Sequence, residues 1–94
     1  MSFASKIVLH SRSGYRPELD ALVEAFVCAK VAFVAVVGVD ASRLEDIVDE
    51  LCIGDGSAPY ELLTSSHTDE SLQEVIDFAN SLSLFTGDVQ VIEF

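Results

Sequence analysis

Basic side chains are scarce in this chain of 94 residues, where five lysines and arginines stand against 16 aspartates and glutamates and the formal net charge is -11. Proteins that bind nucleic acid neutralise phosphates with an excess of Lys and Arg, so the charge balance excludes nucleic acid as a general ligand. It argues equally against an anionic membrane surface. Apolar residues make up 50% of the chain, which is too many for a disordered acidic segment.

Long apolar runs, targeting signals and clustered metal ligands are also missing. The longest apolar run, 31–37, has the length of a strand and falls far short of the roughly 18 residues of a spanning helix. The first five residues show no signal-peptide pattern. The two cysteines, Cys28 and Cys52, make no disulfide framework, and Cys and His never stand at metal-site spacing. We therefore expect a cytoplasmic protein that has no membrane association, no metal and no cofactor.

Three segments carry apolar residues at the spacing that puts one stripe on one helix face. They cover Leu19–Val27, Leu44–Cys52 and Leu72–Ala79. The start signals are Pro17 for the first, a capping box of Ser42 with Glu45 for the second, and a capping box of Ser71 with Glu74 for the third, with Thr68 or Asp69 as alternative caps. Gly54 fits a left-handed stop for the second helix.

Four further segments have the pattern of strands. Residues 6–10 and 31–39 are nearly continuous apolar runs, which is typical of strands covered on both faces. Residues 60–64 are mixed, and residues 89–94 come close to alternation, with Gln90 and Glu93 as polar members, which suits an edge strand.

The order of these elements is β-α-β-α-β-α-β, and strands that alternate with helices predict a parallel sheet with right-handed crossovers. We expect residues 1–94 to form a single α/β domain, a Rossmann-like three-layer sandwich around a four-stranded, mainly parallel sheet. The first two strands look most buried, which favours the spatial order 3-2-1-4 over the flavodoxin-like order 2-1-3-4.

Positive charge gathers where ligands bind in such folds, beyond the carboxyl ends of the strands. Arg12, Arg16 and Arg43 fall at or near the loops that follow predicted strands, whereas Lys6 and Lys30 begin strands at the opposite end.

An anion such as phosphate, sulfate or a carboxylate would suit this edge, because Arg12 and Arg16 flank a helix start whose free N–H groups favour negative charge. The residues of the predicted ligand-binding site are Ser11, Arg12, Ser13, Gly14, Arg16, Ser66 and His67. The loop is neither GxGxxG nor a P-loop, and arginines that are simply solvated or ion-paired are the plainer explanation.

No catalytic residue is predicted. His67 follows two serines, but adjacency in sequence supplies neither the geometry of a Ser–His pair nor its orienting acid, and no GxSxG motif exists. Capping of a helix by Ser66, His67 or Thr68 is the favoured interpretation. Asp40 fits an N-cap as well as a ribose ligand. Both cysteines are expected to be buried, inert thiols.

The acidic residues are unevenly distributed. Residues 1–39 hold four basic and three acidic side chains, whereas residues 40–94 hold one basic and thirteen acidic ones. This charge suits either a solvated face that keeps a small protein soluble or a surface that docks a basic protein partner.

The chain ends in an apolar strand without Pro or Lys to blunt its edge, so a homodimer through the C-terminal strand is a further hypothesis. Tyr15, Tyr60 and Phe94 are expected to form an exposed apolar patch beside it.

Four stretches, KIVLHSRSGYRPELDALVEAF, VVGVD, DELCIGDGS and PYELLTSSH, resemble a small uncharacterised bacterial domain family. The resemblance implies a bacterial, cytosolic, single-domain protein with a Rossmann-like arrangement. It transfers no activity and no functional residue.

Small size, the missing catalytic constellation and the one-sided acidic surface together favour a non-enzymatic protein-interaction or regulatory module. The alternative is a small anion- or nucleotide-binding protein, with or without an enzymatic activity, that uses the loop after the first strand.

Overall fold

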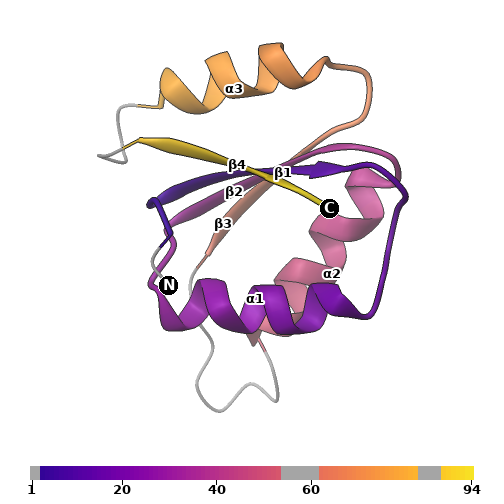
Figure 1. The fold of residues 1–94 in the computed structure, drawn as a ribbon, viewed down its shortest axis with the longest axis vertical. Helices are drawn as coiled ribbons and strands as arrows, with labels where there is room; N and C mark the ends of the chain where they lie inside the picture. The colour runs from indigo at the N-terminus through magenta and orange to yellow at the C-terminus, as the bar shows by residue number, and fades with distance from the viewer. Residues whose placement is uncertain (1–2, 54–61, 83–87) are drawn as a thin grey trace.

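Four parallel strands form one sheet in the order β3-β2-β1-β4, as Figure 1 shows for the computed structural model, which describes residues 3–53, 62–82 and 88–94. The elements along the chain are β1 (Lys6–Ser11), α1 (Glu18–Cys28), β2 (Phe33–Gly38), α2 (Ala41–Ile53), β3 (Leu63–His67), α3 (Leu72–Asn80) and β4 (Val89–Glu93). Both the α/β class and the favoured strand order are confirmed, and the flavodoxin-like order is not adopted. None of the described helices is long and apolar enough to cross a membrane.

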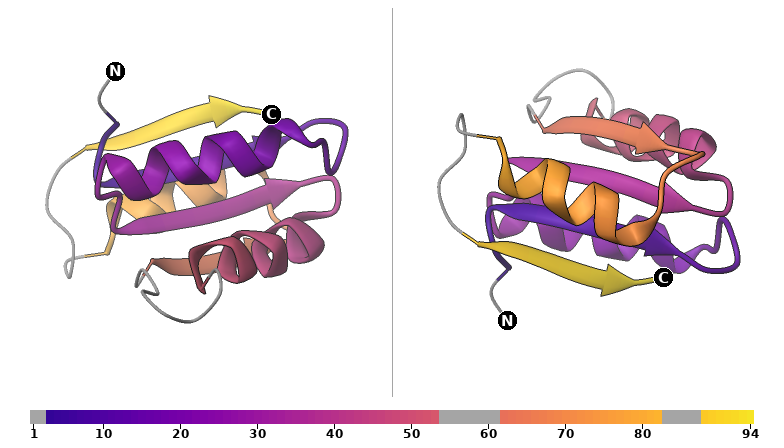
Figure 2. Two further views of the ribbon diagram at one scale, coloured as in Figure 1. Left: turned by 90° about the horizontal axis from the view of Figure 1, so that it is seen from below. Right: turned by 90° about the horizontal axis from the view of Figure 1, so that it is seen from above.

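The sheet lies between two helical layers, with α1 and α2 on one face and α3 on the other (Figure 2). Residues that alternate along β1 therefore enter different cores: Ile7 and Leu9 pack with α1 and α2, and Val8 packs with Val75 of α3. This two-sided burial explains why β1 and β2 read as unbroken apolar runs.

Local signals explain both ends of α3. The Ser71 hydroxyl accepts a hydrogen bond from the Glu74 N–H at 3.2 Å, and the Glu74 carboxylate accepts one from the Ser71 N–H at 3.1 Å, which confirms the predicted capping box. At the other end, the buried Lys6 donates from Nζ to the Ala79 carbonyl at 3.2 Å. A cation at a helix C-terminus complements the helix dipole.

The capping box predicted for α2 is wrong. This helix begins at Ala41, the Asp40 carbonyl accepts the Leu44 N–H at 2.9 Å, and Ser42 already lies inside the first turn. The Glu45 carboxylate instead contacts the hydroxyl of Thr64 in β3. Packing of α2 against β3 therefore directs the Glu45 side chain toward the sheet and away from the helix N-terminus.

The third strand extends beyond its predicted end, because residues 65–67 pair with β2 residues 35–37 in parallel register. The three residues are thus part of the sheet, and the cap of α3 is Ser71, so the predicted capping by Ser66, His67 or Thr68 is wrong. Residues 65–67 are polar, but pairing with β2 makes them part of a strand and not of a loop. Gly54 and Tyr60, singled out as a helix stop and a patch residue, lie outside the described residues.

Two predictions about burial are also wrong. Cys28 is exposed, because α1 ends there and turns its last residue outward, while Cys52 is buried as expected. Phe94 is only 7% exposed, since it packs against the α1 side of the sheet and does not join an exposed aromatic patch.

Candidate functional site

Because the strands are parallel, the loops after β1, β2 and β3 all lie at one end of the sheet, beyond the carboxyl ends of the strands. The chain leaves β2 toward α2 on one face and leaves the neighbouring β3 toward α3 on the other (Figure 1). The two connections therefore diverge beyond the carboxyl ends of adjacent strands, which is the end of the sheet where ligands bind in open α/β folds.

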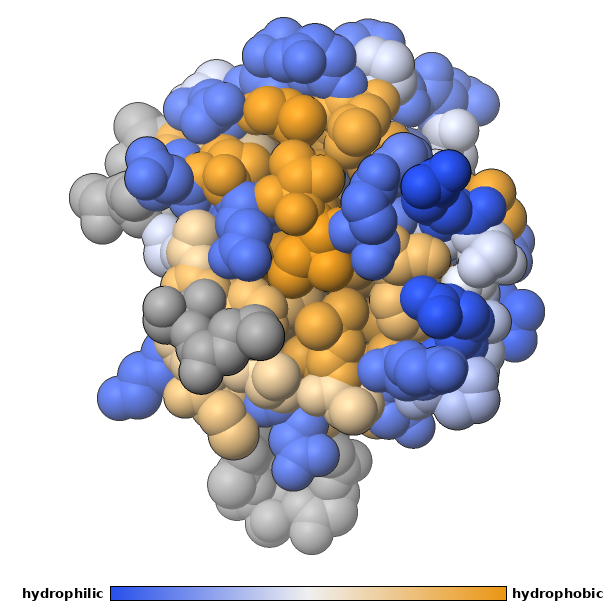
Figure 3. Space-filling view, viewed as in Figure 1, coloured by the Kyte–Doolittle hydropathy of each residue, from blue (hydrophilic) through white to orange (hydrophobic). Residues whose placement is uncertain are grey.

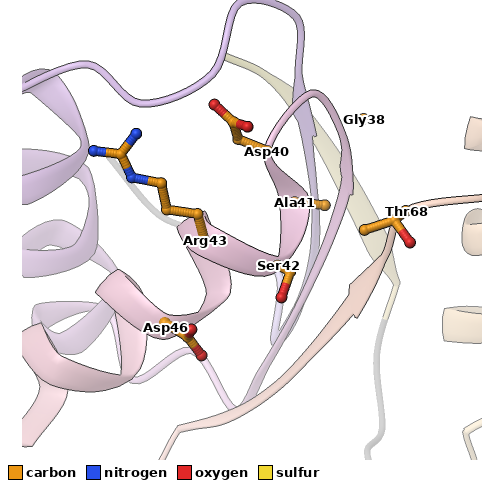
Figure 4. A pocket seen from close by; sticks show the side chains of 7 residues that line it. All are labelled: Gly38, Asp40, Ala41, Ser42, Arg43, Asp46 and Thr68. Atoms are coloured by element: carbon orange, nitrogen blue, oxygen red, sulfur yellow. The ribbon is translucent and has the colours of Figure 1, made fainter.

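An open hollow of about 590 Å³ lies at this point (Figure 4). It is lined by Gly38, Asp40, Ala41, Ser42, Arg43, Asp46 and Thr68. The α2 N-terminus and one guanidinium would favour an anion here, but two carboxylates line the same hollow. Arg43 is moreover turned toward the Tyr15 ring, with its guanidinium carbon 5.7 Å from the ring centroid.

The loop after β1 folds on itself rather than into an open cradle. The buried Ser11 accepts a hydrogen bond from the Gly14 N–H at its hydroxyl, at 3.2 Å. Gly14 has φ +86° and backs onto the Asp40 side chain. Arg12 and Ser13 are exposed on this loop. The Ser11 hydroxyl and the Gly14 N–H are thus hydrogen-bonded to each other within the loop.

The arginines at the carboxyl end of the sheet point to different partners. The Arg16 guanidinium lies 4.3 Å from the Phe94 ring centroid, and its Nη2 donates to the Phe94 carbonyl at 3.4 Å. Ser66 and His67 belong to β3, which is separated from β1 by β2. The structure therefore brings Ser11 and Gly14 together but keeps Ser66 and His67 apart from Arg16. The ligand-binding role of these residues stays a prediction.

Sequence reasoning missed a hydrogen-bonded relay on β3 and the turn after it. Ser65 Oγ lies 2.8 Å from His67 Nε2, and His67 Nδ1 lies 2.9 Å from Glu70 Oε1. Side chains two apart on a strand share a face, and the acid follows three residues later. The pattern S-x-H-x-x-E was visible, but the strand was predicted to end before Ser65.

On the opposite face of β3, two carboxylates of α2 meet one hydroxyl. Thr64 Oγ1 lies 3.0 Å from Glu45 Oε2 and 2.7 Å from Asp49 Oδ1. A hydroxyl has one proton, so it satisfies only one of these acceptors. Burial and the nearby Asp49 both raise the pKa of the Cys52 thiol on the same helix. This thiol stays protonated at neutral pH.

The ion pairs in the described ranges involve histidine only: His10 with Glu93, and His67 with Glu70. No Lys or Arg there lies within 4.0 Å of an Asp or Glu oxygen. The acidic surface is thus not compensated within the described part of the chain. No group of three or more potential metal ligands occurs there either.

Residues 3–90 match a family described as "Domain of unknown function (DUF7684)". No curated protein and no solved structure matches the chain. The resemblance to an uncharacterised domain family is thereby confirmed. Because the match spans nearly the whole sequence, the chain belongs to the DUF7684 family.

Proposed function

We propose that the chain is a small cytoplasmic protein-interaction module whose outer β3 edge and α2 carboxylates bind a basic, extended segment of a partner. The carboxylates of α2 that have no Lys or Arg partner carry this proposal. The free thiols of Cys28 and Cys52 suit a reducing compartment.

The backbone of β3 supplies the second part of such a binding surface. On the inner side of β3, which faces β2, the Leu63 N–H donates to the Ala32 carbonyl at 3.2 Å. Alternate residues of a strand face opposite sides, so Thr64 and Ser66 turn their backbone groups outward. No described strand pairs with this side of β3. An exposed edge accepts an added strand through main-chain hydrogen bonds.

Charge selects the partner. Glu45 and Asp49 lie against Thr64, directly beside the outward backbone groups. An acidic segment would be repelled there, whereas Lys or Arg side chains on an added strand would reach these carboxylates. The two carboxylates that line the hollow beside α2 weaken the case for the alternative, an anion-binding function.

An alternating Lys-Val-Arg-Val-Lys peptide is the probe that tests this function. We expect it to shift the amide NMR signals of Thr64 and Ser66 and to lose affinity as salt is added. The double variant Glu45→Gln/Asp49→Asn should weaken binding about tenfold, because each exposed charge pair contributes up to about 1 kcal/mol.

The matched control removes the same charge elsewhere. Glu18→Gln/Glu24→Gln neutralises two carboxylates on α1, away from β3, and should change the affinity by less than about threefold. Equal weakening by both double variants, or no binding of the peptide at low salt, would contradict the proposed docking surface.

The opposite edge of the sheet suits a second copy of the chain. Apolar residues gather over β4 between α3 and α1 (Figure 3), and Val91 is 39% exposed. A groove of about 500 Å³ runs beside β4, lined by Phe3, Arg16, Glu18, Ala21, Leu22, Ala25, Ile92, Glu93 and Phe94. Two copies that met at β3 would bring like charges together, so β4 is the edge that self-association favours.

Light scattering tests this pairing. The Phe94 N–H faces β1, where it donates to the His10 carbonyl at 2.7 Å, so by alternation the Val91 N–H faces outward. We expect the protein to have twice the 10.2 kDa mass of one chain, and Val91→Pro to restore the single mass without loss of fold. Val91→Thr keeps the N–H and should stay dimeric. A single-chain mass for the unmodified protein at high concentration would exclude the dimer.

A further inference from the structure

The geometry on the α3 side of β3 points to Ser65 as an activated nucleophile that attacks esters, with His67 as its general base and Glu70 as a positioning residue. This inference does not rest on the proposed docking function: the docking carboxylates lie on the other face of the strand, and the two roles share only the Ser66 backbone N–H. It rests on the two linked contacts of 2.8 Å and 2.9 Å that join the three side chains.

The relay fixes the tautomer that such chemistry needs. An ionised carboxylate only accepts hydrogen bonds, so His67 Nδ1 keeps its proton and donates a hydrogen bond to Glu70 Oε1. Nε2 is then left with a lone pair that faces Ser65 Oγ. Serine hydrolases have the same order of hydroxyl, imidazole and carboxylate on several unrelated folds.

The imidazole is held in place by its surroundings. His67 is 8% exposed, and its ring lies 5.1 Å from the ring of Phe78, centroid to centroid. Ser65 is partly exposed on the same face of the strand. The base is thus held in place beside a serine that is only partly buried.

A backbone donor stands next to the nucleophile. The Leu63 N–H donates to the Ala32 carbonyl on the β2 side, so by alternation along the strand the Ser66 N–H turns away from β2. In hydrolases with a nucleophile elbow, the N–H of the residue after the serine helps to bind the oxyanion. Ser66 occupies that position relative to Ser65.

The neighbouring side chains define the class of ester. Leu63, which is 56% exposed, shares a strand face with Ser65, and Phe78, which is 38% exposed, packs against the His67 ring. These two apolar side chains are available to contact an acyl group. Phe33 neighbours both of these residues: it is paired with Leu63 in register, and its ring centroid lies 6.3 Å from that of Phe78. With Glu70 beside the base, the site suits neutral or cationic esters with a short apolar acyl chain.

The reaction needs no reagent beyond the ester and water. Ser65 Oγ forms a bond to the carbonyl carbon while its proton moves to His67 Nε2, and the carbonyl π electrons move to the oxygen. That oxyanion collapses, the ester C–O bond breaks, and Nε2 gives its proton to the departing alcohol. Water then attacks the acyl-serine with the same base, which releases the carboxylic acid and regenerates Ser65.

Covalent labelling with a fluorophosphonate, followed by peptide mapping, tests the nucleophile. Ser65 Oγ displaces fluoride, so we expect one phosphonyl adduct per chain and its mass on Ser65. Ser65→Ala should abolish the adduct, and Ser66→Ala, the matched neighbour, should keep it. His67→Gln should slow labelling about 100-fold or more, within the range of general-base contributions.

Hydrolysis of p-nitrophenyl acetate tests the positioning role. Glu70→Gln should lower kcat at least about tenfold with an unchanged KM, because the amide stabilises the wrong tautomer, and Glu70→Asp should restore part of kcat. No adduct, an adduct on another residue, or equal labelling of the unmodified chain and the His67→Gln variant would overturn the inference.

Discussion

Gly38→Ala is expected to destabilise the protein by about 3 kcal/mol or more, since a left-handed conformation alone costs an alanine about 1–2 kcal/mol. Gly38 ends β2 with φ +106°, and a Cβ there would lie 2.3 Å from the Ser11 carbonyl oxygen. That oxygen is part of the backbone and is held by the Val39 N–H at 3.0 Å, so it cannot move aside cheaply. The clash adds to the conformational cost and places the change among the most damaging single substitutions.

Gly14→Ala is the matched control, because it has a similar positive φ but a different neighbour. A Cβ at Gly14 would lie 2.8 Å from Oδ2 of Asp40, which is the far end of an exposed side chain. We expect this variant to lose about 1–2 kcal/mol, the conformational cost alone. Urea unfolding followed by circular dichroism compares the two variants. Equal destabilisation by both would show that the carbonyl contact has no special weight.

The clash at Gly38 also shows how the strands position the candidate site. Ser11 and Gly38 are partners in the parallel register of β1 and β2, and the turn that follows each of them begins at this point. The sequence predicted these turns, because the apolar runs end at residues that favour them. It did not predict the close approach of the two chains, which depends on the register.

The fold was predictable because burial on both faces leaves a direct mark in the sequence. Residues 6–10 and 31–39 are almost uniformly apolar, which two-layer coverage requires, and the helical stripes fix where the crossovers lie. The edge strand β3 carries no such mark. Thr64 lies against the carboxylates of α2, while Ser65 and His67 lie on the α3 face, where Ser65 is only partly buried.

The relay on β3 was missed for the same reason. Ser65 and His67 share a face only if residues 63–67 are extended, and in the predicted loop they would have had no fixed relation. The pairing of Ser65 with Ala35 and of His67 with Val37 sets that extension. For the arginines, the sequence predicted the location but not the contacts. They do lie near the predicted edge, but Arg16 and Arg43 pack over separate aromatic rings.

Phe26→Ala is expected to cost about 3–5 kcal/mol, the range for truncating a buried aromatic side chain. Phe26 is fully buried, and its ring meets that of Phe3 edge-on, with centroids 5.1 Å apart. It belongs to the core shared by α1, α2 and the sheet. A domain of this size has a total stability of roughly 5–15 kcal/mol, so the variant should keep only a small margin.

Two companion variants separate cavity formation from the loss of an aromatic ring. Phe26→Leu keeps most of the volume and should cost less than about 1.5 kcal/mol. Phe78→Ala removes a ring that is 38% exposed, and it should also cost less than about 1.5 kcal/mol because water already reaches that site. Urea midpoints at a constant m-value give all three free energies. If Phe26→Ala and Phe78→Ala lost the same stability, the α1 side of the sheet would not be the main core. The order Phe26→Ala, then Phe26→Leu and Phe78→Ala, follows directly from the enclosed volume around each ring.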